Sequence, residues 1–177
     1  MKNRYLTLTR SKGTDEYYTP QSAVSLIAPY ISPDKTIWCP FDTEKSNFVS
    51  VFRARGNTVI RSHIDDGKDF LTYEPEKYDV IVSNPPYSLK NEVYARLFQL
   101  NKPFAMLFNM TGIFSAQNRF ALCSRHGVEL FIPKKRIKYF TDYADPEGST
   151  VKSPPFLSVY VCHKLLPERL ILEDVTA

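Results

Sequence analysis

Short runs of β-prone hydrophobic residues alternate along the chain with longer stretches whose hydrophobic positions recur at the spacing of a helix. The hydrophobic runs predict strands over residues 36–39, 57–61, 79–83, 104–108, 128–132 and 156–162. The longer stretches predict helices over residues 20–28, 48–56, 89–100 and 114–123. Because strands that alternate with helices build a mainly parallel sheet with helices on both faces, we expect a single-domain α/β fold.

The domain is expected to begin near two residues that suit a helix start. Thr19 is a suitable N-cap and Pro20 suits the first helical position. Residues 1–19 are polar and basic with scattered aromatic residues, so we expect an N-terminal arm or lid, and residues 20–177 form the domain. Ligands of such sheets bind outside the carboxyl ends of the strands, so the loops after strands hold the candidate functional residues.

Net charge, cysteine content and the lack of long apolar stretches indicate the kind of partner and the cellular setting of the protein. The 177 residues carry a formal net charge of +4, which permits a polyanionic partner. The three cysteines (Cys39, Cys123 and Cys162) are odd in number and match no metal-ligand spacing, so a reducing cytoplasm is the simplest setting. No apolar stretch approaches membrane-spanning length, and the N-terminus has no apolar signal-peptide core, so no membrane association is expected.

The most specific motif is Asn84-Pro85-Pro86-Tyr87, directly after the strand predicted over 79–83. Two prolines fix the backbone in a stiff loop. That loop would hold the Asn84 side-chain oxygen and the Pro85 carbonyl as fixed acceptors, with Tyr87 as an aromatic face nearby. Two acceptors and a stacking surface suit a planar ring with an exocyclic amino group, such as adenine. Alternatively, Asn-Pro-Pro is a plain strand terminator and surface turn.

This motif resembles that of the class I amino-methyltransferases that use S-adenosylmethionine, most closely the adenine-N6 DNA methyltransferases, which read Asn/Asp-Pro-Pro-Tyr/Phe at the end of a central strand. The resemblance implies a Rossmann-like fold, S-adenosylmethionine as cofactor and DNA as partner. It also implies that residues 84–87 are catalytic and that the target base is flipped out of the duplex. The compact chain looks like a phage or mobile-element enzyme without a separate target-recognition domain, so a partner subunit could supply recognition.

The loop after the first predicted strand resembles the first cofactor motif of that family in Pro40-Phe41 and in its position. It contains no glycine, which normally lets the backbone approach a ligand closely. We therefore expect the Asp42 carboxylate and backbone groups around Pro40 to hold the methionine part of the cofactor. The alternative is an ordinary loop in which Thr43 or Ser46 caps the next helix.

Three further segments are expected at the cofactor by the same resemblance. His63 or Asp65, after the second strand, would accept hydrogen bonds from the ribose hydroxyls. Asp69 and Phe70 resemble an Asp-Phe pair that holds the adenine ring, although Asp65-Asp66-Gly67 is also a good turn and Phe70 would suit the core. The segment Tyr17-Tyr18-Thr19 resembles an element that closes over the cofactor.

The segment 133–140 is the expected nucleic-acid contact. Its basic side chains (Lys134, Lys135, Arg136 and Lys138) suit phosphates, and Tyr139 and Phe140 suit stacking on bases. A solvated charge run is the alternative. The stretch 141–153 is longer than a usual connection and is expected to be functional or mobile.

Two rival functions stay open. The same motif occurs in enzymes that methylate ribosomal RNA or a protein glutamine, although the glutamine enzymes generally carry an additional N-terminal domain. A non-catalytic nucleic-acid-binding relative would explain the glycine-free loop but not the intact residues 84–87.

Overall fold

The computed structural model describes residues 17–151 and 156–174. Most of the expected N-terminal arm (residues 1–16) therefore lies outside the described residues. In the described part, no helix is long and apolar enough to cross a membrane.

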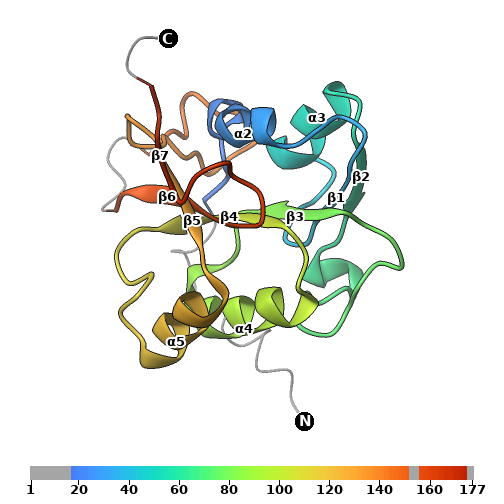
Figure 1. The fold of residues 1–177 in the computed structure, drawn as a ribbon. Helices are drawn as coiled ribbons and strands as arrows, with labels where there is room; N and C mark the ends of the chain where they lie inside the picture. Colours follow the sequence, from blue (N-terminus) through green and yellow to red (C-terminus); the bar gives the residue numbers. More distant parts are fainter. Residues whose placement is uncertain (1–16, 152–155, 175–177) are drawn as a thin grey trace.

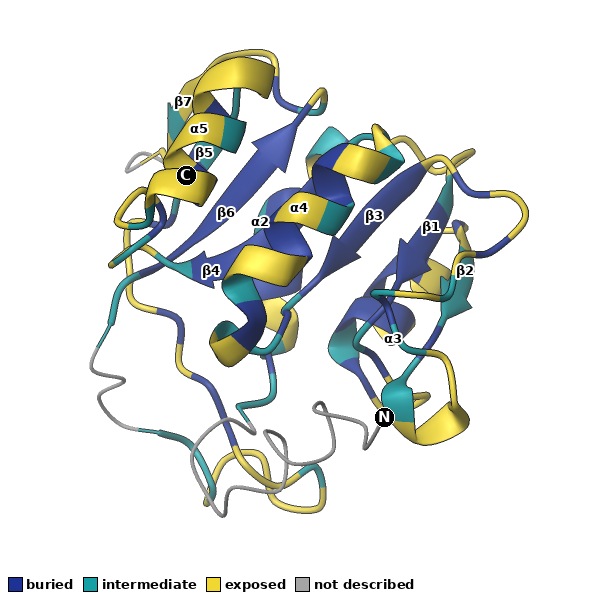
Figure 2. Ribbon diagram, turned by 90° about the horizontal axis from the view of Figure 1, so that it is seen from below, coloured by how far each residue is buried: buried dark blue, intermediate teal, exposed yellow. Residues whose placement is uncertain are grey.

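One seven-stranded sheet forms the centre of the fold, in the order β2-β1-β3-β4-β6-β5-β7 (Figure 1). Its strands are β1 (Thr36–Cys39), β2 (Thr58–Arg61), β3 (Val80–Ser83), β4 (Phe104–Asn109), β5 (Glu129–Ile132), β6 (Ser158–His163) and β7 (Leu170–Leu172). The strands from β2 to β4 pair in parallel, whereas β6 runs antiparallel to both β4 and β5. The carboxyl ends of β1, β3 and β4 therefore meet at one edge, away from which β6 points (Figure 2).

Helices cover both faces of this sheet. Figure 1 shows α2 (Gln21–Ile27) and α3 (Asn47–Ala54) above it, and α4 (Lys90–Leu100) and α5 (Gln117–His126) below it. Short 3₁₀ turns lie at Ala28–Tyr30 (η1), Ile64–Asp66 (η2) and Tyr87–Leu89 (η3). The expected α/β architecture with a mainly parallel sheet and helices on both faces is confirmed.

The strands contribute side chains to two separate hydrophobic layers, one on each face of the sheet, because successive side chains of a strand point to opposite faces. In β1, Ile37 and Cys39 pack with α2 and α3, whereas Trp38 packs with α4 and the residues around Phe70. Figure 2 shows the consequence: the central strands β1, β3, β4 and β6 are buried almost throughout, while β2, β5 and β7 are partly exposed and the helices expose their outer sides. All three cysteines are buried and free.

Several element boundaries differ from the expectations. Helix α2 begins at Gln21 with Pro20 as its N-cap, because Pro20 has an extended ψ of 153°, and no side chain caps it. Helix α5 begins at Gln117, three residues later than predicted. Strand β7 was not predicted. It is three residues long and pairs with β5 at the sheet edge with two of its residues exposed, so it lacks a buried strand's hydrophobic pattern.

Candidate active site

The Asn84–Tyr87 motif leaves the sheet at the carboxyl end of β3, between the ends of β1 and β4. Pro85 is buried and Pro86 is half-buried, with an extended backbone (ψ 126°) that leads directly into η3 and then α4. The described residues contain no cis peptide bond, so both prolines follow trans bonds. The motif is thus a rigid turn anchored at both ends by regular structure.

Of the two polar atoms of the Asn84 side chain, one has a hydrogen-bond partner and the other has none among the described residues. Its Nδ2 donates a hydrogen bond to the backbone oxygen of Tyr17 at 3.4 Å. Its Oδ1 is buried and has no hydrogen-bond partner among the described residues. Because a buried acceptor without a partner costs free energy, such an atom is expected to receive a donor from a ligand.

Asn84 borders a cavity of about 90 Å³ at the carboxyl edge of the sheet. The cavity brings together most of the predicted cofactor residues, namely Tyr17, Tyr18, Thr19, Phe41, Asp42 and His63. Pro40, Asp65, Asp69 and Phe70 do not line it. Its wall also contains residues that the sequence analysis did not predict as ligand contacts, namely Thr43, Ser46, Asn47, Phe48 and Tyr143.

Asp42 is the buried acidic group of this cavity, with only 5% of its surface exposed. Its backbone N–H donates to the Ser62 carbonyl at 3.2 Å, and its carboxylate accepts a hydrogen bond from the Ser83 hydroxyl. Burial raises the pKa of Asp42 from 3.8 to about 6, and hydrogen bonds from Ser83 and Ser46 oppose this rise. A buried carboxylate at a cavity wall is an acceptor for a cationic or hydrogen-bond-donating ligand group.

The loop alternative, in which Thr43 or Ser46 caps α3, is only partly realised. Ser46 is the N-cap of α3, but its side chain makes no capping hydrogen bond. Its hydroxyl instead accepts from the Thr43 backbone N–H at 3.0 Å. This hydrogen bond within the loop after β1 holds the turn from Thr43 to Ser46, so the turn forms without a glycine.

His63 and Asp65 separate after β2. His63 lines the cavity, and its Nδ1 accepts from the Asp65 backbone N–H at 3.2 Å. The Asp65 side chain is 81% exposed and does not line the cavity, although its carboxylate lies 3.3 Å from His63 Nδ1. Of the two residues, His63 lines the cavity and Asp65 does not.

The Asp69-Phe70 pair lies elsewhere, and the alternative explanation applies. Phe70 is buried in the core, with ring centroids 5.3 Å from Trp38 and 5.0 Å from Phe41. The Asp69 carboxylate accepts from the Leu71 backbone N–H at 2.9 Å, which forms a local turn. Because Phe70 has no free face, its predicted stacking on a ligand ring is corrected: it supports Phe41, which does line the cavity.

The segment from Tyr17 to Thr19 closes one side of the cavity. Tyr18 and Phe140 exchange backbone hydrogen bonds of 2.8 and 3.2 Å, and Phe140 also pairs with Thr150. The Tyr18 ring lies 4.3 Å from the ring of Tyr143. Burial raises the pKa of Tyr143 to about 12, so this hydroxyl stays protonated at neutral pH. The long connection after Phe140 thus reaches the site through Tyr143.

Tyr87 sits in an aromatic cluster beside Asn84. Its ring lies 5.4 Å from Phe156, and the Lys90 ammonium lies 5.2 Å from its centroid. The Tyr139 hydroxyl donates to Ser158 Oγ at 2.7 Å and lies 3.4 Å from the Tyr87 hydroxyl. Burial raises the pKa of Tyr87 well above its usual value.

The basic segment alternates between surface and core. Lys134, Lys135, Arg136 and Lys138 are exposed, which fits both phosphate contacts and the alternative of a solvated charge run. Ile137, Tyr139 and Phe140 are buried. The predicted stacking of Tyr139 and Phe140 on bases is therefore corrected, because both rings are already packed inside the protein.

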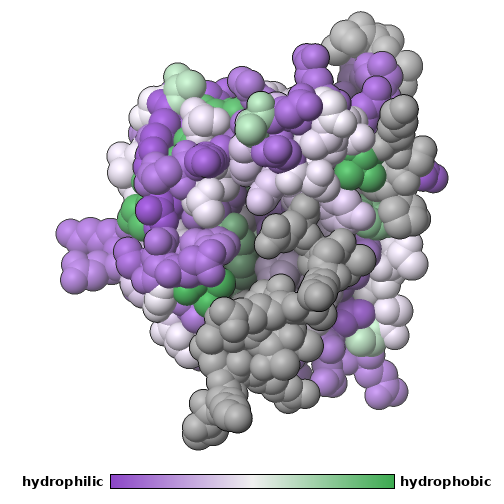
Figure 3. Space-filling model, turned by 180° about the vertical axis from the view of Figure 1, so that it is seen from behind, coloured by the Kyte–Doolittle hydropathy of each residue, from purple (hydrophilic) through white to green (hydrophobic). Residues whose placement is uncertain are grey.

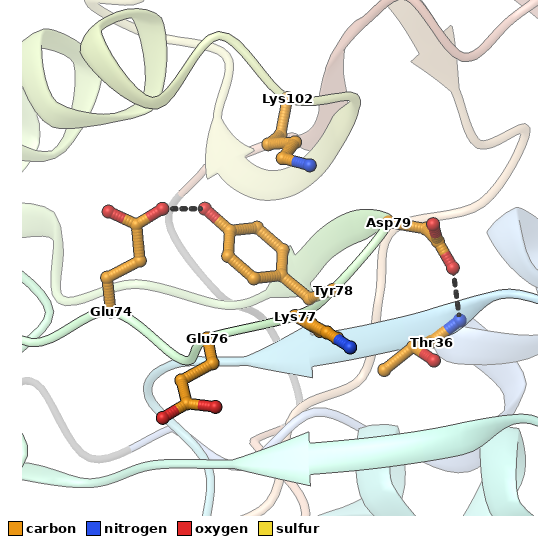
Figure 4. Close-up of a pocket in the computed structure, with 7 residues that line it drawn as sticks. All are labelled: Thr36, Glu74, Glu76, Lys77, Tyr78, Asp79 and Lys102. Carbon is orange, nitrogen blue, oxygen red and sulfur yellow. Dashed lines mark hydrogen bonds between the residues drawn. The ribbon is translucent and has the colours of Figure 1, made fainter.

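A second cavity of about 440 Å³ lies at the opposite, amino-terminal ends of the strands (Figure 4). Its lining residues are Thr36, Glu74, Glu76, Lys77, Tyr78, Asp79 and Lys102. Glu74 accepts from the Tyr78 hydroxyl at 2.8 Å, and Asp79 accepts from the Thr36 backbone N–H at 2.8 Å. It is larger than the cavity at Asn84, but none of its described lining residues carries a buried polar atom without a partner, and it lies at the edge where sheets of this kind do not bind ligands. The described residues contain no cluster of metal-ligating side chains.

Comparisons with known proteins identify the fold. A proposed RNA methyltransferase from Pyrococcus horikoshii matches with a TM-score of 0.57 and 13% identity over 92% of this chain and 98% of that one. A TehB-like S-adenosylmethionine-dependent methyltransferase from Corynebacterium glutamicum has a TM-score of 0.49 and 14% identity over 91% and 94% of the two chains. The modification subunit of a proposed type I restriction enzyme from Vibrio vulnificus has a TM-score of 0.48 and 11% identity over 89% and 47%.

No protein-family model and no curated protein matches the chain. At these identities the likeness concerns the fold. The chain has the Rossmann-like fold of methyltransferases, in a single compact sheet with helices on both faces.

Proposed function

We propose that this protein is a methyltransferase that uses S-adenosylmethionine and methylates the N6 amino group of adenine in DNA. One observation carries the proposal: Asn84 Oδ1, at the end of β3, is a buried acceptor without a partner among the described residues, at the rim of the carboxyl-edge cavity. An exocyclic amino group is the donor that such an atom can accept from.

The donor chemistry of the cavity fits the cofactor. Asp42 offers a buried carboxylate for the ammonium group of the methionine part, and Phe41 and Tyr18 offer ring faces for the adenosine part. His63 offers a ring for hydrogen bonding to ribose. The volume of about 90 Å³ is small beside the roughly 300–1,000 Å³ typical of ligand sites, so the Tyr17–Thr19 segment and Tyr143 must move outward when the cofactor binds.

The chain contributes positioning and electrostatics to the reaction. Asn84 Oδ1 and the Pro85 carbonyl accept hydrogen bonds from the target amino group and draw its lone pair out of conjugation with the ring. When bound, S-adenosylmethionine supplies an electrophilic sulfonium methyl, so that a nitrogen–carbon bond forms as the sulfur–carbon bond breaks and the amino group releases a proton to solvent. The stiff Pro85-Pro86 turn holds both acceptors before substrate arrives, which lowers the barrier without reorganisation.

Nucleic acid is the proposed acceptor because the exposed basic residues 134–138 begin at the end of β5, the same edge of the sheet as Asn84. Adenine must leave the duplex to reach Asn84, so base flipping is part of the proposal. The described residues form one sheet with its covering helices. Sequence preference would then depend on the loops at this edge or on a partner subunit.

Transfer of labelled methyl from S-adenosylmethionine to unmethylated DNA and to RNA, read by nucleoside mass spectrometry, tests the proposal. N6-methyladenine in the DNA is the expected product. Label only in RNA would establish the RNA alternative, and label in a glutamine-containing peptide the protein alternative. No transfer and no cofactor binding would leave the non-catalytic nucleic-acid-binding alternative.

A further inference from the structure

The loop that follows β4, residues 110–116, exposes large hydrophobic side chains at the edge of the sheet that holds Asn84. Met110 is 43% exposed and Phe114 is 44% exposed. Phe120, 59% exposed, follows on the first turn of α5. The other exposed large hydrophobic residues of the described part, Leu170 and Leu172, are on the edge strand β7. Figure 3 shows the rear face of the molecule, where hydrophilic side chains predominate among the coloured residues and hydrophobic ones appear in several separate places.

A buried arginine fixes the conformation of this loop. Arg119 is only 8% exposed, and its guanidinium donates to the carbonyls of Gly112 (2.7 Å) and Ile113 (3.3 Å) and to Ser115 Oγ (3.1 Å). It also donates to Asn91 Oδ1 on α4. Gly112 adopts a φ of +87°, which allows the tight turn around the guanidinium.

The loop therefore presents Phe114 on a preorganised backbone. Ile113 is buried in the core beside it, so the chain is anchored on one side and the neighbouring phenyl ring projects on the other. An aromatic side chain held this way loses little conformational entropy when it binds a partner.

A short path of contacts joins the loop to the candidate catalytic motif. The strand β4 pairs with β3, with Ser83 opposite Met106, and ends at Asn109. Asn109 Oδ1 accepts from the Lys90 ammonium at 2.7 Å, and that ammonium lies 5.2 Å from the centroid of the Tyr87 ring. The loop thus begins two contacts away from Tyr87.

We propose that the loop 110–116 is a nucleic-acid contact in which Phe114 stacks on bases that flank the flipped nucleotide. This inference rests on the proposed nucleic-acid substrate. Aromatic rings stack on any base, and the exposed basic segment 134–138 at the same edge complements phosphates. The three exposed side chains, Met110, Phe114 and Phe120, are too small a patch for a stable protein–protein interface, which needs about 800 Å² from each partner.

Phe114 in this loop would have the stacking role that the sequence analysis assigned to Tyr139 and Phe140. Tyr139 and Phe140, predicted to stack on bases, are buried in the core. Phe114 lies at the same edge with its ring exposed.

The test compares Phe114→Ala with Leu170→Ala, a matched loss of an exposed hydrophobic side chain at the amino end of β7. The probe is a fluorescein-labelled DNA duplex with a mismatched adenine, followed by anisotropy without cofactor. Phe114→Ala is expected to weaken DNA binding by about 5- to 150-fold, the range for loss of one base–aromatic stack. Leu170→Ala is expected to leave it unchanged, and Phe114→Trp to restore it.

The outcomes separate this inference from the proposed function. Weaker DNA binding by Phe114→Ala in a protein that transfers no methyl group would support the loop contact and overturn the enzyme. Normal methyl transfer with equal DNA affinity and equal KM in both alanine variants would overturn the loop contact and leave the enzyme. A dimer in sedimentation that Phe114→Ala abolishes, with DNA affinity unchanged, would also overturn it, as would an absence of measurable DNA binding by the wild-type protein.

Discussion

The Ser83 hydroxyl donates a hydrogen bond to the carboxylate of Asp42, joining the last residue of β3 to the loop after β1. The contact spans 41 residues of sequence and places the candidate cofactor carboxylate next to the residue that precedes Asn84. The two proposed halves of the site, cofactor and acceptor, are therefore coupled through one buried hydrogen bond.

Asp42→Asn is expected to stabilise the protein at neutral pH. Burial raises the folded-state pKa of Asp42 to about 6, above its unfolded value of 3.8, so the folded chain binds the proton more tightly. The free energy of unfolding then falls as pH rises from about 4 to about 6 and stays lower above that. Removing the charge should recover up to about 3 kcal/mol at pH 7.5, measured by urea unfolding at pH 5 and 7.5. A variant that is less stable than wild type at pH 7.5 would contradict the buried charge.

The same substitution is expected to weaken cofactor binding. Above pH 6 the Asp42 carboxylate is ionised and attracts the ammonium group of S-adenosylmethionine, and below pH 6 it becomes protonated. Calorimetric titration should show wild-type affinity falling as pH drops from 7.5 to 5, and Asp42→Asn should be weak at both. His63→Gln, at the same cavity, is the control and should keep the pH dependence. Equal affinity of wild type and Asp42→Asn for S-adenosylmethionine would contradict the proposed contact between Asp42 and the cofactor.

Tyr139→Phe is expected to lower the free energy of unfolding by about 1 kcal/mol, because it leaves the buried Ser158 hydroxyl without its 2.7 Å partner. Tyr87→Phe should have a smaller effect, since the Tyr87–Tyr139 contact is 3.4 Å long. Tyr30→Phe, at a half-buried tyrosine, is the matched control. Urea unfolding of the three variants measures the order, and an equal loss in all three would contradict the assignment.

Arg119→Met is expected to lower the free energy of unfolding by about 2–3 kcal/mol. The substitution removes the donors for the carbonyls of Gly112 and Ile113 while keeping most of the side-chain volume. Arg125→Met, at an exposed position of the same helix, should change stability by less than about 0.5 kcal/mol. Limited proteolysis should cut the 110–116 loop faster in Arg119→Met only. Equal stability and equal cleavage of both variants would mean that Arg119 does not hold the loop.

Elements whose form depends on neighbouring residues alone could be predicted from the sequence. The bounds of β1 match the prediction because Thr36–Cys39 is a short apolar run between turn-forming residues, and residues 84–87 define a rigid loop by proline alone. The position of Asp42 and His63 around one cavity also agrees with the rule that loops after parallel strands converge, whereas Tyr17 was placed there by resemblance.

Contacts between residues far apart in the sequence determine where Tyr143 and Phe70 lie. Tyr143 reaches the cavity because it packs on Tyr18, across more than a hundred residues of sequence, and no local pattern encodes that contact. The burial of Tyr139 did have a local signal: Ile137, Lys138 and Tyr139 alternate buried, exposed and buried, the period of a strand rather than of a surface charge run. Phe70 was assigned by resemblance, but the aromatic core around Trp38 takes its ring.

Single-turnover methyl transfer by Asn84→Ala, alongside wild type, tests the central claim most directly. Wild type is expected to form N6-methyladenine in DNA. In Asn84→Ala, loss of the unpartnered acceptor Oδ1 should slow transfer by at least about a hundredfold, while calorimetric affinity for S-adenosylmethionine stays within about threefold. A variant that transfers methyl groups within tenfold of the wild-type rate would contradict the assignment of Asn84 as the residue that holds the target amino group.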